Sequence, residues 1–446
     1  MTWLAVIRAK HTMKILVVGS GGREHAICST LLRTASRQMQ IVCVPGNAGI
    51  AQIAECVPIN ISDEHALLNF AQANQIDLTV VGPEAPLAAG LVDLFEQQGL
   101  RIFGPRADAA RLESSKAFAK AFMDRHSIPT ARYDVVTSLD AAAACLRTGK
   151  FGDEETGVVI KADGLAAGKG VFVANNRSEA FSALSELRNG VAGVEAIRKI
   201  VIEERLTGPE VSILLFSDGR NHRVMPAARD HKRIGENDTG PNTGGMGSVT
   251  DSSIVDETML DRIDREIIEP TLQGCRDEGF PFRGVLFLGL MLTPDGPRVL
   301  EYNVRFGDPE TQSILVRLQT DLTEIFQAVT ETRLDELQIG WLPGASACVV
   351  LAARGYPAKA ETGATILGLD AAAQHEQVSI FHAATSRSGN DWLTAGGRVV
   401  GVTATGEKLD SALTRCYGAV REINWQGMQY RRDIGRTLGA DDSGHN

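Results

Sequence analysis

The sequence predicts a multidomain protein of mixed α/β and α+β fold, with an N-terminal doubly wound parallel sheet, a central α+β unit and a small C-terminal α+β domain. The chain has 446 residues, a length that suggests about three domains. Its N-terminal part alternates apolar strands with helical stretches, which is the pattern of a parallel sheet. Beyond Trp341 the charged clusters become sparse and a new group of strands begins.

Composition argues against several classes of protein. Hydrophobic residues make up 43% of the chain and charged residues 22%, as in soluble globular proteins. The net charge of −10 argues against wholesale nucleic-acid binding, so anionic substrates must be held by local basic clusters. The seven cysteines are scattered without a CxxC pair, which favours reduced thiols in a cytoplasmic protein. No apolar run is long enough to cross a bilayer, so we expect no membrane partner.

The first predicted element is the segment KILVVGSGG at residues 14–22, an apolar strand that runs into a glycine turn before a helical stretch at 23–32. A strand, a glycine turn and a helix N-terminus together form a binding site for anions. Glu24 breaks the GxGxxG fingerprint of dinucleotide-binding domains, so the phosphate of a small metabolite fits better. A plain first turn of an open sheet is the alternative.

Three more strands are predicted in this domain, at residues 40–44, 78–81 and 102–103, with helical stretches at 63–74 and 88–98. Each of these strands ends in a turn that contains glycine and proline. Ligands of doubly wound sheets bind beyond the carboxyl ends of the strands, where all of these turns lie.

A helix is predicted at residues 114–125, with Lys116 and Lys120 on one face because they are four residues apart. For that spacing alone, a solvated face is the favoured interpretation. Residues 131–205 then form a small α+β unit. Its strands are expected near 133–136, 158–160, 170–174 and 199–203, and its helix near 178–188.

The glycine-rich segment KADGLAAGKG, residues 161–170, lies inside this unit as a flap. Its three glycines let the backbone approach a ligand closely, and Lys161 and Lys169 supply positive charge for a polyphosphate. It is not a Walker A motif, because only three residues separate Gly164 from the Gly-Lys pair and no Ser or Thr follows. A tight hairpin with solvated lysines is the alternative.

Two polar segments follow. Residues 227–233, AARDHKR, are dense in charge, and residues 238–247, DTGPNTGGMG, are predicted to form a long flexible loop. Such a loop within a folded domain is more often functional than accidental.

A buried strand is predicted at residues 284–292, and a second strand leads into EYNVRFGDPETQ, residues 301–312. Because alternate side chains of a strand share a face, Glu301, Asn303 and Arg305 should project together. A carboxylate and an amide oxygen suit Mg²⁺, and an arginine beside them would bind a phosphate or carboxylate. An edge strand with exposed polar residues is the alternative.

The last unit is predicted from three strands, at residues 345–352, 377–382 and 398–405, followed by a helix at 407–421. It has fewer charged clusters than the preceding units, so the sequence offers no site residue there.

Nine motifs of the chain occur in the order seen in one enzyme family. They are GSGGREHA, PGNAG, VGPEAPL, IFGP, SKAFAK, KADGLAAGKG, DHKR, DTGPNTGGMG and RFGDPETQ. In these motifs the chain resembles the glycinamide ribonucleotide synthetases, or phosphoribosylamine–glycine ligases, of the ATP-grasp group. The resemblance covers residues 13 to about 436 and implies a central two-lobed ATP-grasp fold.

The resemblance implies a division of the chain by function. Residues 1–12 would be an extension, 13–113 the phosphoribosylamine domain, 114–338 the ATP-grasp domain with a flap subdomain at about 131–205, 339–436 the C-terminal α+β domain, and 437–446 a tail. The implied reaction joins glycine to 5-phosphoribosylamine in purine synthesis, with ATP and Mg²⁺ (or Mn²⁺) as cofactors. Transient contact with neighbouring purine-pathway enzymes would be compatible with this role.

The family's site residues carry over to matching positions. The resemblance implies ATP binding by Lys116, Lys161, Gly164, Gly168, Lys169, Gly170, Glu204, Leu206 and Glu210, and metal binding by Glu301 and Asn303. It implies catalytic roles for Arg305, Asp230 and Lys161, with Asp230 near the glycine amine and Arg305 at the acyl phosphate. It places the phosphoribosylamine phosphate at Gly21, Gly22, Arg23 and Asn47.

The chain departs from the family pattern in its N-terminal extension, in residues 248–254, and in residues 285–292, which lack a carboxylate that ATP-grasp enzymes often carry. Metal binding is therefore expected to depend on Glu301, Asn303 and the phosphates. Two alternatives stay open: an ATP-grasp ligase for a different acid, and a nucleotide-binding module without catalysis. The second would predict loss of Glu301, Asn303 or Arg305, and all three are present.

Overall fold

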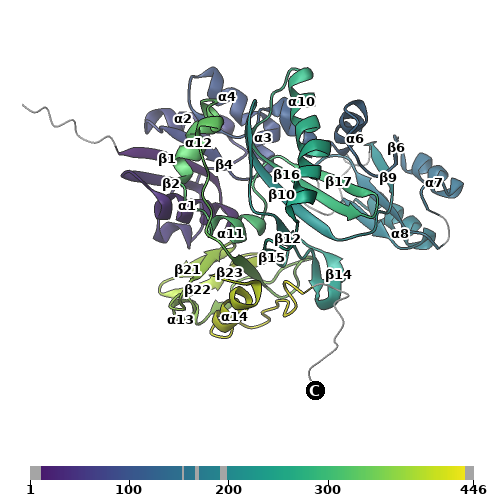
Figure 1. Ribbon diagram of the computed structural model, residues 1–446. Coiled ribbons are helices and arrows are strands. Elements are labelled where there is room, and N and C mark those ends of the chain that lie inside the picture. Colours follow the sequence, from purple (N-terminus) through teal and green to yellow (C-terminus); the bar gives the residue numbers. More distant parts are fainter. Residues whose placement is uncertain (1–11, 153–154, 166–169, 191–197, 437–446) are drawn as a thin grey trace, which may run out of the picture.

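The computed structural model describes residues 12–152, 155–165, 170–190 and 198–436, so residues 1–11 and the predicted tail at 437–446 lie outside the described residues. Figure 1 shows the N-terminal domain beside the central sheet, the C-terminal elements below them, and a smaller lobe with β6, β9, α7 and α8 on the far side. None of the described helices is long and apolar enough to cross a membrane.

The N-terminal sheet is parallel throughout, with the strand order β3-β2-β1-β4-β5, which confirms the predicted doubly wound sheet. Its strands are β1 (Met13–Gly19), β2 (Met39–Pro45), β3 (Glu55–Cys56), β4 (Leu78–Val81) and β5 (Ile102–Phe103). Its helices are α1 (Gly22–Thr34), α2 (Glu64–Ala73), α3 (Glu84–Ala89), α4 (Leu91–Gln97) and α5 (Ala107–Ser114). The strand order reverses between β1 and β4, so the turns after these strands open at a switch point where ligands bind in such sheets.

The single helix predicted at residues 88–98 is wrong. The structure has two helices there, and Gly90 separates them with a φ of +96°. Glycine adopts this left-handed conformation without strain and commonly ends a helix.

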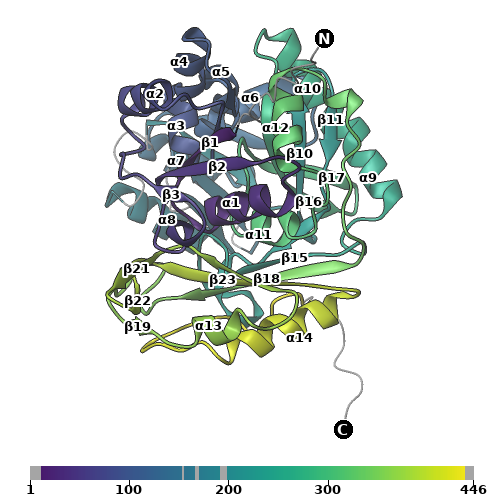
Figure 2. The ribbon, with the colours of Figure 1, turned by 90° about the vertical axis from the view of Figure 1, so that its left-hand side faces the viewer.

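The central sheet has nine strands and continues into the C-terminal part of the chain. Its order is β17-β16-β10-β12-β15-β18-β23-β20, and β11 pairs with β10 outside this order. The strands are β10 (Glu210–Asp218), β11 (His222–Val224), β12 (Ala228–Asp230), β15 (Gly247–Thr250), β16 (Arg283–Thr293), β17 (Gly296–Asn303), β18 (Ala345–Ala352), β20 (Val378–His382) and β23 (Arg398–Gly406). The predicted C-terminal strands therefore exist, but they extend the central sheet through the β15–β18 pair (Figure 2).

Helices cover both faces of this sheet. Near β18, α14 packs on one face of the sheet and α11 on the other (Figure 2). The helices of this part are α6 (Lys116–Arg125), α9 (Glu257–Ile263), α10 (Glu269–Asp277), α11 (Glu310–Leu315), α12 (Leu322–Thr330), α13 (Leu369–Ala372) and α14 (Leu409–Val420), and a π-helical turn (Asp264–Ile268) joins α9 to α10. A separate three-stranded sheet, in the order β19-β22-β21, lies in the C-terminal part, with strands β19 (Thr365–Ile366), β21 (Thr385–Ser388) and β22 (Asp391–Thr394).

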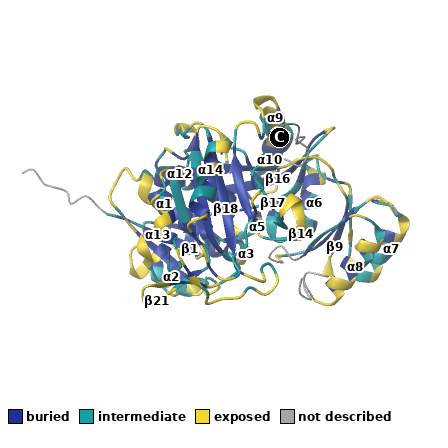
Figure 3. Cartoon of the chain, turned by 90° about the horizontal axis from the view of Figure 1, so that it is seen from below, coloured by how far each residue is buried: buried dark blue, intermediate teal, exposed yellow. Residues whose placement is uncertain are grey.

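The smaller lobe is an antiparallel sheet in the order β6-β9-β7-β8. Its elements are β6 (Tyr133–Val136), α7 (Leu139–Thr148), β7 (Val158–Ala162), β8 (Val171–Ala174), α8 (Arg177–Arg188) and β9 (Ile200–Glu204). Only α7 was not predicted. Figure 3 shows the lobe projecting from the body, with α7 and α8 on its outer side and β9 on the side that faces the body.

The long loop predicted at residues 238–247 is partly wrong. Residues Thr239–Asn242 form β14, which pairs with β13 (Arg233–Gly235) in a hairpin, and Gly247 begins β15. The several glycines and the lack of apolar alternation concealed this short polar strand from sequence analysis.

Candidate active site

A cleft with a volume of about 460 Å³ lies where all parts of the chain meet. The N-terminal domain contributes Arg23, the smaller lobe Lys161, the central strands Glu301, and β23 contributes Arg398. Among the described residues, basic and acidic side chains line it in equal number. They are Arg23, Lys116, Lys120, Lys161, Lys232, Arg305 and Arg398, with Glu84, Glu113, Glu203, Asp230, Glu301, Asp308 and Glu310.

The structure brings about half of the predicted site residues into this cleft. Those that line it are Arg23, Lys116, Lys161, Gly170, Asp230, Glu301, Asn303 and Arg305. Those that do not are Gly21, Gly22, Asn47, Gly164, Glu204, Leu206 and Glu210. Gly168 and Lys169 lie outside the described residues.

Glu301 and Asn303 reach the cleft because they alternate along β17, with the buried Tyr302 between them. Burial tends to raise the pKa of Glu301, but Lys232, Lys161 and Lys116 outweigh it and hold the pKa below its usual value. The carboxylate is therefore ionised at neutral pH. Together with the amide oxygen of Asn303, it forms a pair of hard oxygen donors that fits a divalent cation such as Mg²⁺.

The alternation that predicted these residues does not extend to Arg305, because β17 ends at Asn303. Arg305 is held instead by side chains: its Nη2 donates to Asn303 Oδ1 at 3.0 Å and lies 2.9 Å from Glu113 Oε1. Its Nε lies 3.4 Å from Glu84 Oε2. Burial tends to lower the pKa of Arg305, but the carboxylates of Glu113 and Glu84 reverse this and raise it.

One buried carboxylate holds two lysines on the lobe side of the cleft. Glu203 Oε1 lies 2.9 Å from Lys161 Nζ, and Glu203 Oε2 lies 3.0 Å from Lys120 Nζ. Lys120 also donates to Thr130 Oγ1 at 2.7 Å. Burial lowers the pKa of Lys120 to about 8, against the opposing effect of Glu203. The expected solvated face for Lys116 and Lys120 is therefore wrong, since Lys120 is only 2% exposed.

Lys116 ties the start of α6 to the glycine-rich segment. Its Nζ donates to the carbonyl oxygen of Gly164 at 3.0 Å. Asp163, the residue before, accepts hydrogen bonds from Ser115 Oγ and from the Ala117 backbone N–H, both at 3.1 Å. Ser115 in turn caps α6 by accepting from the Phe118 N–H. The glycine-rich segment is thus attached to a helix N-terminus, and Gly164 contributes its backbone.

A second charged group lines the cleft around Asp230, at the end of β12. Burial raises the pKa of Asp230, and Lys232 opposes this shift. Lys232 forms an ion pair with Glu210 at 3.1 Å, which connects Glu210 to the cleft indirectly. Burial and the charge of Asp230 raise the pKa of Glu310 to about 7. The carboxylates of Asp230 and Glu310 interact with each other, and the positive charge of Lys232 compensates them only in part. This group can therefore hold a cation such as an ammonium ion.

In the first turn of the N-terminal domain, the side-chain carboxylate of Glu24 fills the position predicted for an anion. Glu24 Oε2 accepts the Gly21 N–H at 2.6 Å, and Glu24 Oε1 lies 2.7 Å from Arg23 Nε. Arg23 Nη1 donates to the Phe306 carbonyl oxygen at 2.9 Å. A Cβ on Gly22 would approach Gln312 Nε2 to 2.7 Å, so this turn packs closely against α11.

Asn47 and Arg398 connect the cleft region to the C-terminal part. The Asn47 amide donates to the carbonyl oxygens of Ser20 and His382 at 2.8 and 2.9 Å and accepts from Gly49 and Ile50 N–H. Its amide is therefore engaged by the backbone of this chain. Arg398 Nη1 donates to the carbonyl oxygen of Asp308, and Nη2 lies 3.2 Å from Asp308 Oδ2.

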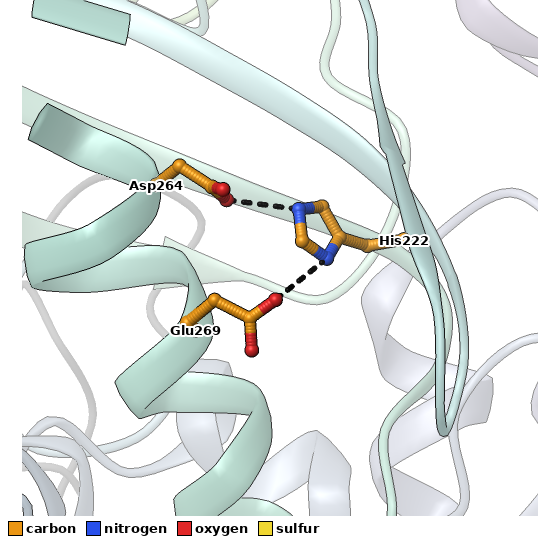
Figure 4. Close-up of side chains that lie close together, drawn as sticks. All are labelled: His222, Asp264 and Glu269. Atoms are coloured by element: carbon orange, nitrogen blue, oxygen red, sulfur yellow. Dashed lines mark hydrogen bonds and ion pairs between the residues drawn. The ribbon is translucent and has the colours of Figure 1, made fainter. Parts of the chain in front are cut away.

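Another group of titratable side chains lies away from the cleft (Figure 4). His222 Nε2 lies 2.8 Å from Asp264 Oδ1, and His222 Nδ1 lies 3.6 Å from Glu269 Oε1. The π-helical turn places both carboxylates on one side, since its hydrogen bonds join residues five apart. The two ring nitrogens face different carboxylates, so we interpret the group as a connection between β11 and this turn.

Sequence analysis missed several residues that line the cleft. Five of these residues lie in or beside a motif named above, and this proximity was the signal that could have identified them as site residues. They are Glu84, Lys120, Lys232, Asp308 and Glu310. No local pattern indicated the others, Glu113, Glu203 and Arg398, because each meets its partners only through tertiary contacts.

The chain is similar to known proteins along nearly its whole length. Three family models match the chain: the N domain of phosphoribosylglycinamide synthetase at residues 13–113, its ATP-grasp (A) domain at 114–311 and its C domain at 346–437. The phosphoribosylamine–glycine ligase of Rhodopirellula baltica is 45% identical over 423 residues, covering 94% of this chain and 96% of the relative. That of Xanthomonas axonopodis pv. citri is 47% identical over 427 residues, covering 95% and 97%.

The crystal structure of phosphoribosylamine–glycine ligase from Thermotoga maritima is also similar. It superimposes with a TM-score of 0.80 at 33% identity, covering 95% of this chain and 100% of that one. The chain therefore belongs to the phosphoribosylglycinamide synthetase family, with its three-domain architecture and central ATP-grasp fold.

Proposed function

We propose that this protein ligates glycine to 5-phosphoribosylamine in de novo purine synthesis, converting ATP to ADP and phosphate and forming glycinamide ribonucleotide. The observation that carries the proposal is the cleft itself. It combines Glu301 and Asn303 with Lys116, Lys161 and Arg305, in a chain that matches the family along nearly its whole length.

The chemistry needs activation of the glycine carboxylate, which is a poor electrophile. Transfer of the γ-phosphoryl group of ATP to a carboxylate oxygen gives glycyl phosphate and ADP. The amine of phosphoribosylamine then attacks the carbonyl carbon, loses a proton, and expels inorganic phosphate as the amide forms. The protein contributes positioning and charge neutralisation, and no nucleophilic side chain is required.

The residues have the following proposed roles. Lys116 and Lys161 bind the ATP phosphates together with Gly164 and Gly170, and Gly168 and Lys169, which lie outside the described residues, stay predictions for the same role. Arg305 neutralises the acyl phosphate, and Asp230 binds the glycine ammonium group. Glu204 and Leu206 at adenine, Glu210 at the ribose, and Gly21, Gly22, Arg23 and Asn47 at the substrate phosphate stay predictions.

Glu301 and Asn303 would hold Mg²⁺ or Mn²⁺, which when bound supplies positive charge to the phosphate oxygens. The fit rests on the two oxygen donors at the end of β17 and on the lysines that keep Glu301 ionised. A Cβ on Gly289, the residue opposite Glu301 in β16, would lie 3.3 Å from Glu301 Cγ, so the Glu301 side chain packs closely over this glycine.

The domain division is proposed as predicted, with a phosphoribosylamine domain at 13–113, the ATP-grasp domain at 114–338 and the C-terminal domain at 339–436. The decisive experiment is a coupled assay of ADP release. We expect release to require glycine and phosphoribosylamine together. ADP formed with another acid would favour a different ATP-grasp ligase, and ATP binding without ADP release would favour a module that lacks catalysis.

A further inference from the structure

We propose that Glu113 is a positioning residue that fixes the guanidinium of Arg305 in the orientation needed at the acyl phosphate. This inference rests on the proposed function, in which Arg305 neutralises that group. Glu113 belongs to none of the motifs discussed above as carrying chemistry, and it lies in the last turn of α5, two residues before Ser115, which caps α6.

Glu113 contacts both the side chain of Arg305 and the backbone of the residue before it. Its Oε1 lies 2.9 Å from Arg305 Nη2, and its Oε2 accepts the backbone N–H of Val304 at 2.8 Å. The strand that carries Glu301 and Asn303 has ended before these residues, so no strand pairing fixes this backbone. One carboxylate therefore anchors both the main chain leading to Arg305 and the tip of its side chain.

The other contacts of Arg305 hold the nitrogens of its guanidinium group to different degrees. Nη2 is fixed by Glu113 and by Asn303, and Nη1 has a longer bond of 3.3 Å to the Phe306 carbonyl oxygen. Nε makes no hydrogen bond within the described part of the chain, and the carboxylate of Glu84 lies 3.4 Å from it. Nη1 makes the longest hydrogen bond of the group, so it is the part of the guanidinium that can most readily turn toward an anionic oxygen of the substrate.

The two carboxylates near Arg305 differ in a way that separates their roles. The Glu113 side chain is 8% exposed and lies at hydrogen-bonding distance, whereas Glu84 is 31% exposed and lies 3.4 Å from Nε. A carboxylate beside an anion site weakens anion binding by charge, so orientation is the benefit that Glu113 can supply. Without it, the guanidinium would be free to pivot toward Glu84, and misplacement by about 1 Å can cost roughly a hundredfold in rate.

The test is the substitution Glu113→Gln, assayed in the full-length protein with ATP, glycine and phosphoribosylamine. The glutamine amide can accept the Val304 N–H or face Nη2 with an oxygen, but it carries no charge and presents a donor on its other side. We expect kcat to fall by roughly tenfold to a hundredfold, while KM for ATP changes by less than about twofold because the lysines are untouched. The matched control is Glu257→Gln, an exposed position at the start of α9, and it should keep wild-type kinetics.

A double-mutant cycle with Arg305→Lys distinguishes positioning from a general structural role. If Glu113 acts through Arg305, adding Glu113→Gln to Arg305→Lys should change kcat by less than about threefold. Multiplicative losses in the double variant, or a kcat of Glu113→Gln equal to that of the wild type, would overturn the inference. If Glu113→Gln fails to fold, Glu113→Asp takes its place, because it keeps the charge on a shorter side chain. An unchanged kcat in Glu113→Asp would then also overturn the inference. If the wild-type protein released ADP without requiring both glycine and phosphoribosylamine, that result would contradict the proposed function and not this inference alone.

Discussion

Glu203 and Lys161 form an ion pair of 2.9 Å inside the cleft, with side chains that are 2% and 7% exposed. The other oxygen of Glu203 pairs with the buried Lys120 at 3.0 Å. A single carboxylate therefore compensates two ammonium groups that are almost entirely buried. Burial of an uncompensated charge is expensive, so this carboxylate controls both the stability of the lobe and the placement of Lys161.

We predict that Glu203→Gln lowers the free energy of unfolding by about 3–5 kcal/mol, because two buried lysines lose their compensating charge. The measurement is urea denaturation of both proteins under the same conditions. The neighbouring substitution Glu204→Gln is the control, since Glu204 pairs with Arg132, which is 72% exposed. That pair should contribute no more than about 1 kcal/mol. Equal effects of the two substitutions would contradict the prediction.

Acidification should destabilise the protein through its buried histidines. Burial, reinforced by Arg431, lowers the pKa of His231 to about 4, and its Nε2 accepts the Gly435 N–H at 2.9 Å. Between the folded pKa and the unfolded value near 6.5, the unfolded chain binds more protons, so stability rises with pH through this range and is lost as pH falls from about 6.5 toward 4.

The substitution His231→Gln should therefore reduce the slope of unfolding free energy against pH by as much as about 1.4 kcal/mol per pH unit in that range. Denaturant titrations at several pH values between the two limits measure the slope. The exposed His65→Gln is the matched control and should leave the slope as it is in the wild type. An unchanged slope in His231→Gln would show that this ring is protonated in the folded protein.

Glu301→Ala should nearly abolish turnover while ATP binding weakens less, because the lysines proposed to bind the phosphates remain and a proposed ligand of the divalent cation is lost. ADP release gives the turnover, and ATP binding is followed by calorimetry with and without Mg²⁺. The Mg²⁺ dependence of ATP binding should diminish in the variant. Full activity would remove Glu301 from the metal site.

Arg23→Ala should raise KM for phosphoribosylamine, because Arg23 is the predicted phosphate ligand of the N-terminal domain that lines the cleft. Its loss also removes a hydrogen bond to the Phe306 carbonyl oxygen, so the unfolding midpoint is measured beside the kinetics. An unchanged KM for phosphoribosylamine in a folded variant would place the phosphate elsewhere.

Local sequence patterns predicted most elements well, for identifiable reasons. The strands at Leu78–Val81 and Ala345–Ala352 were predicted at their observed bounds, because an apolar run with clear turn residues at its ends is a local signal. Glu301 and Asn303 were predicted for the same reason, since strand alternation determines which side chains share a face.

The rest depends on contacts between distant parts of the chain. Glu113 meets a residue 191 positions later in the sequence, Val304, and nothing around Glu113 indicates this partner. The pairing of β15 with β18 likewise joins two short strands whose own sequences are compatible with separate sheets. Lys120 was interpreted as exposed because helical spacing describes which residues share a face, but not what covers it.

The continuity of the central sheet has a consequence for any shortened form of this protein. Ending the chain before Ala345 would remove β18 and leave β15 as an open edge, with unpaired N–H and C=O groups along Gly247–Thr250. Such an edge invites pairing with the same strand of another molecule, so the shortened chain should aggregate. The C-terminal part thus pairs with the edge of β15 that would otherwise be open, and it also contributes Arg398 to the cleft.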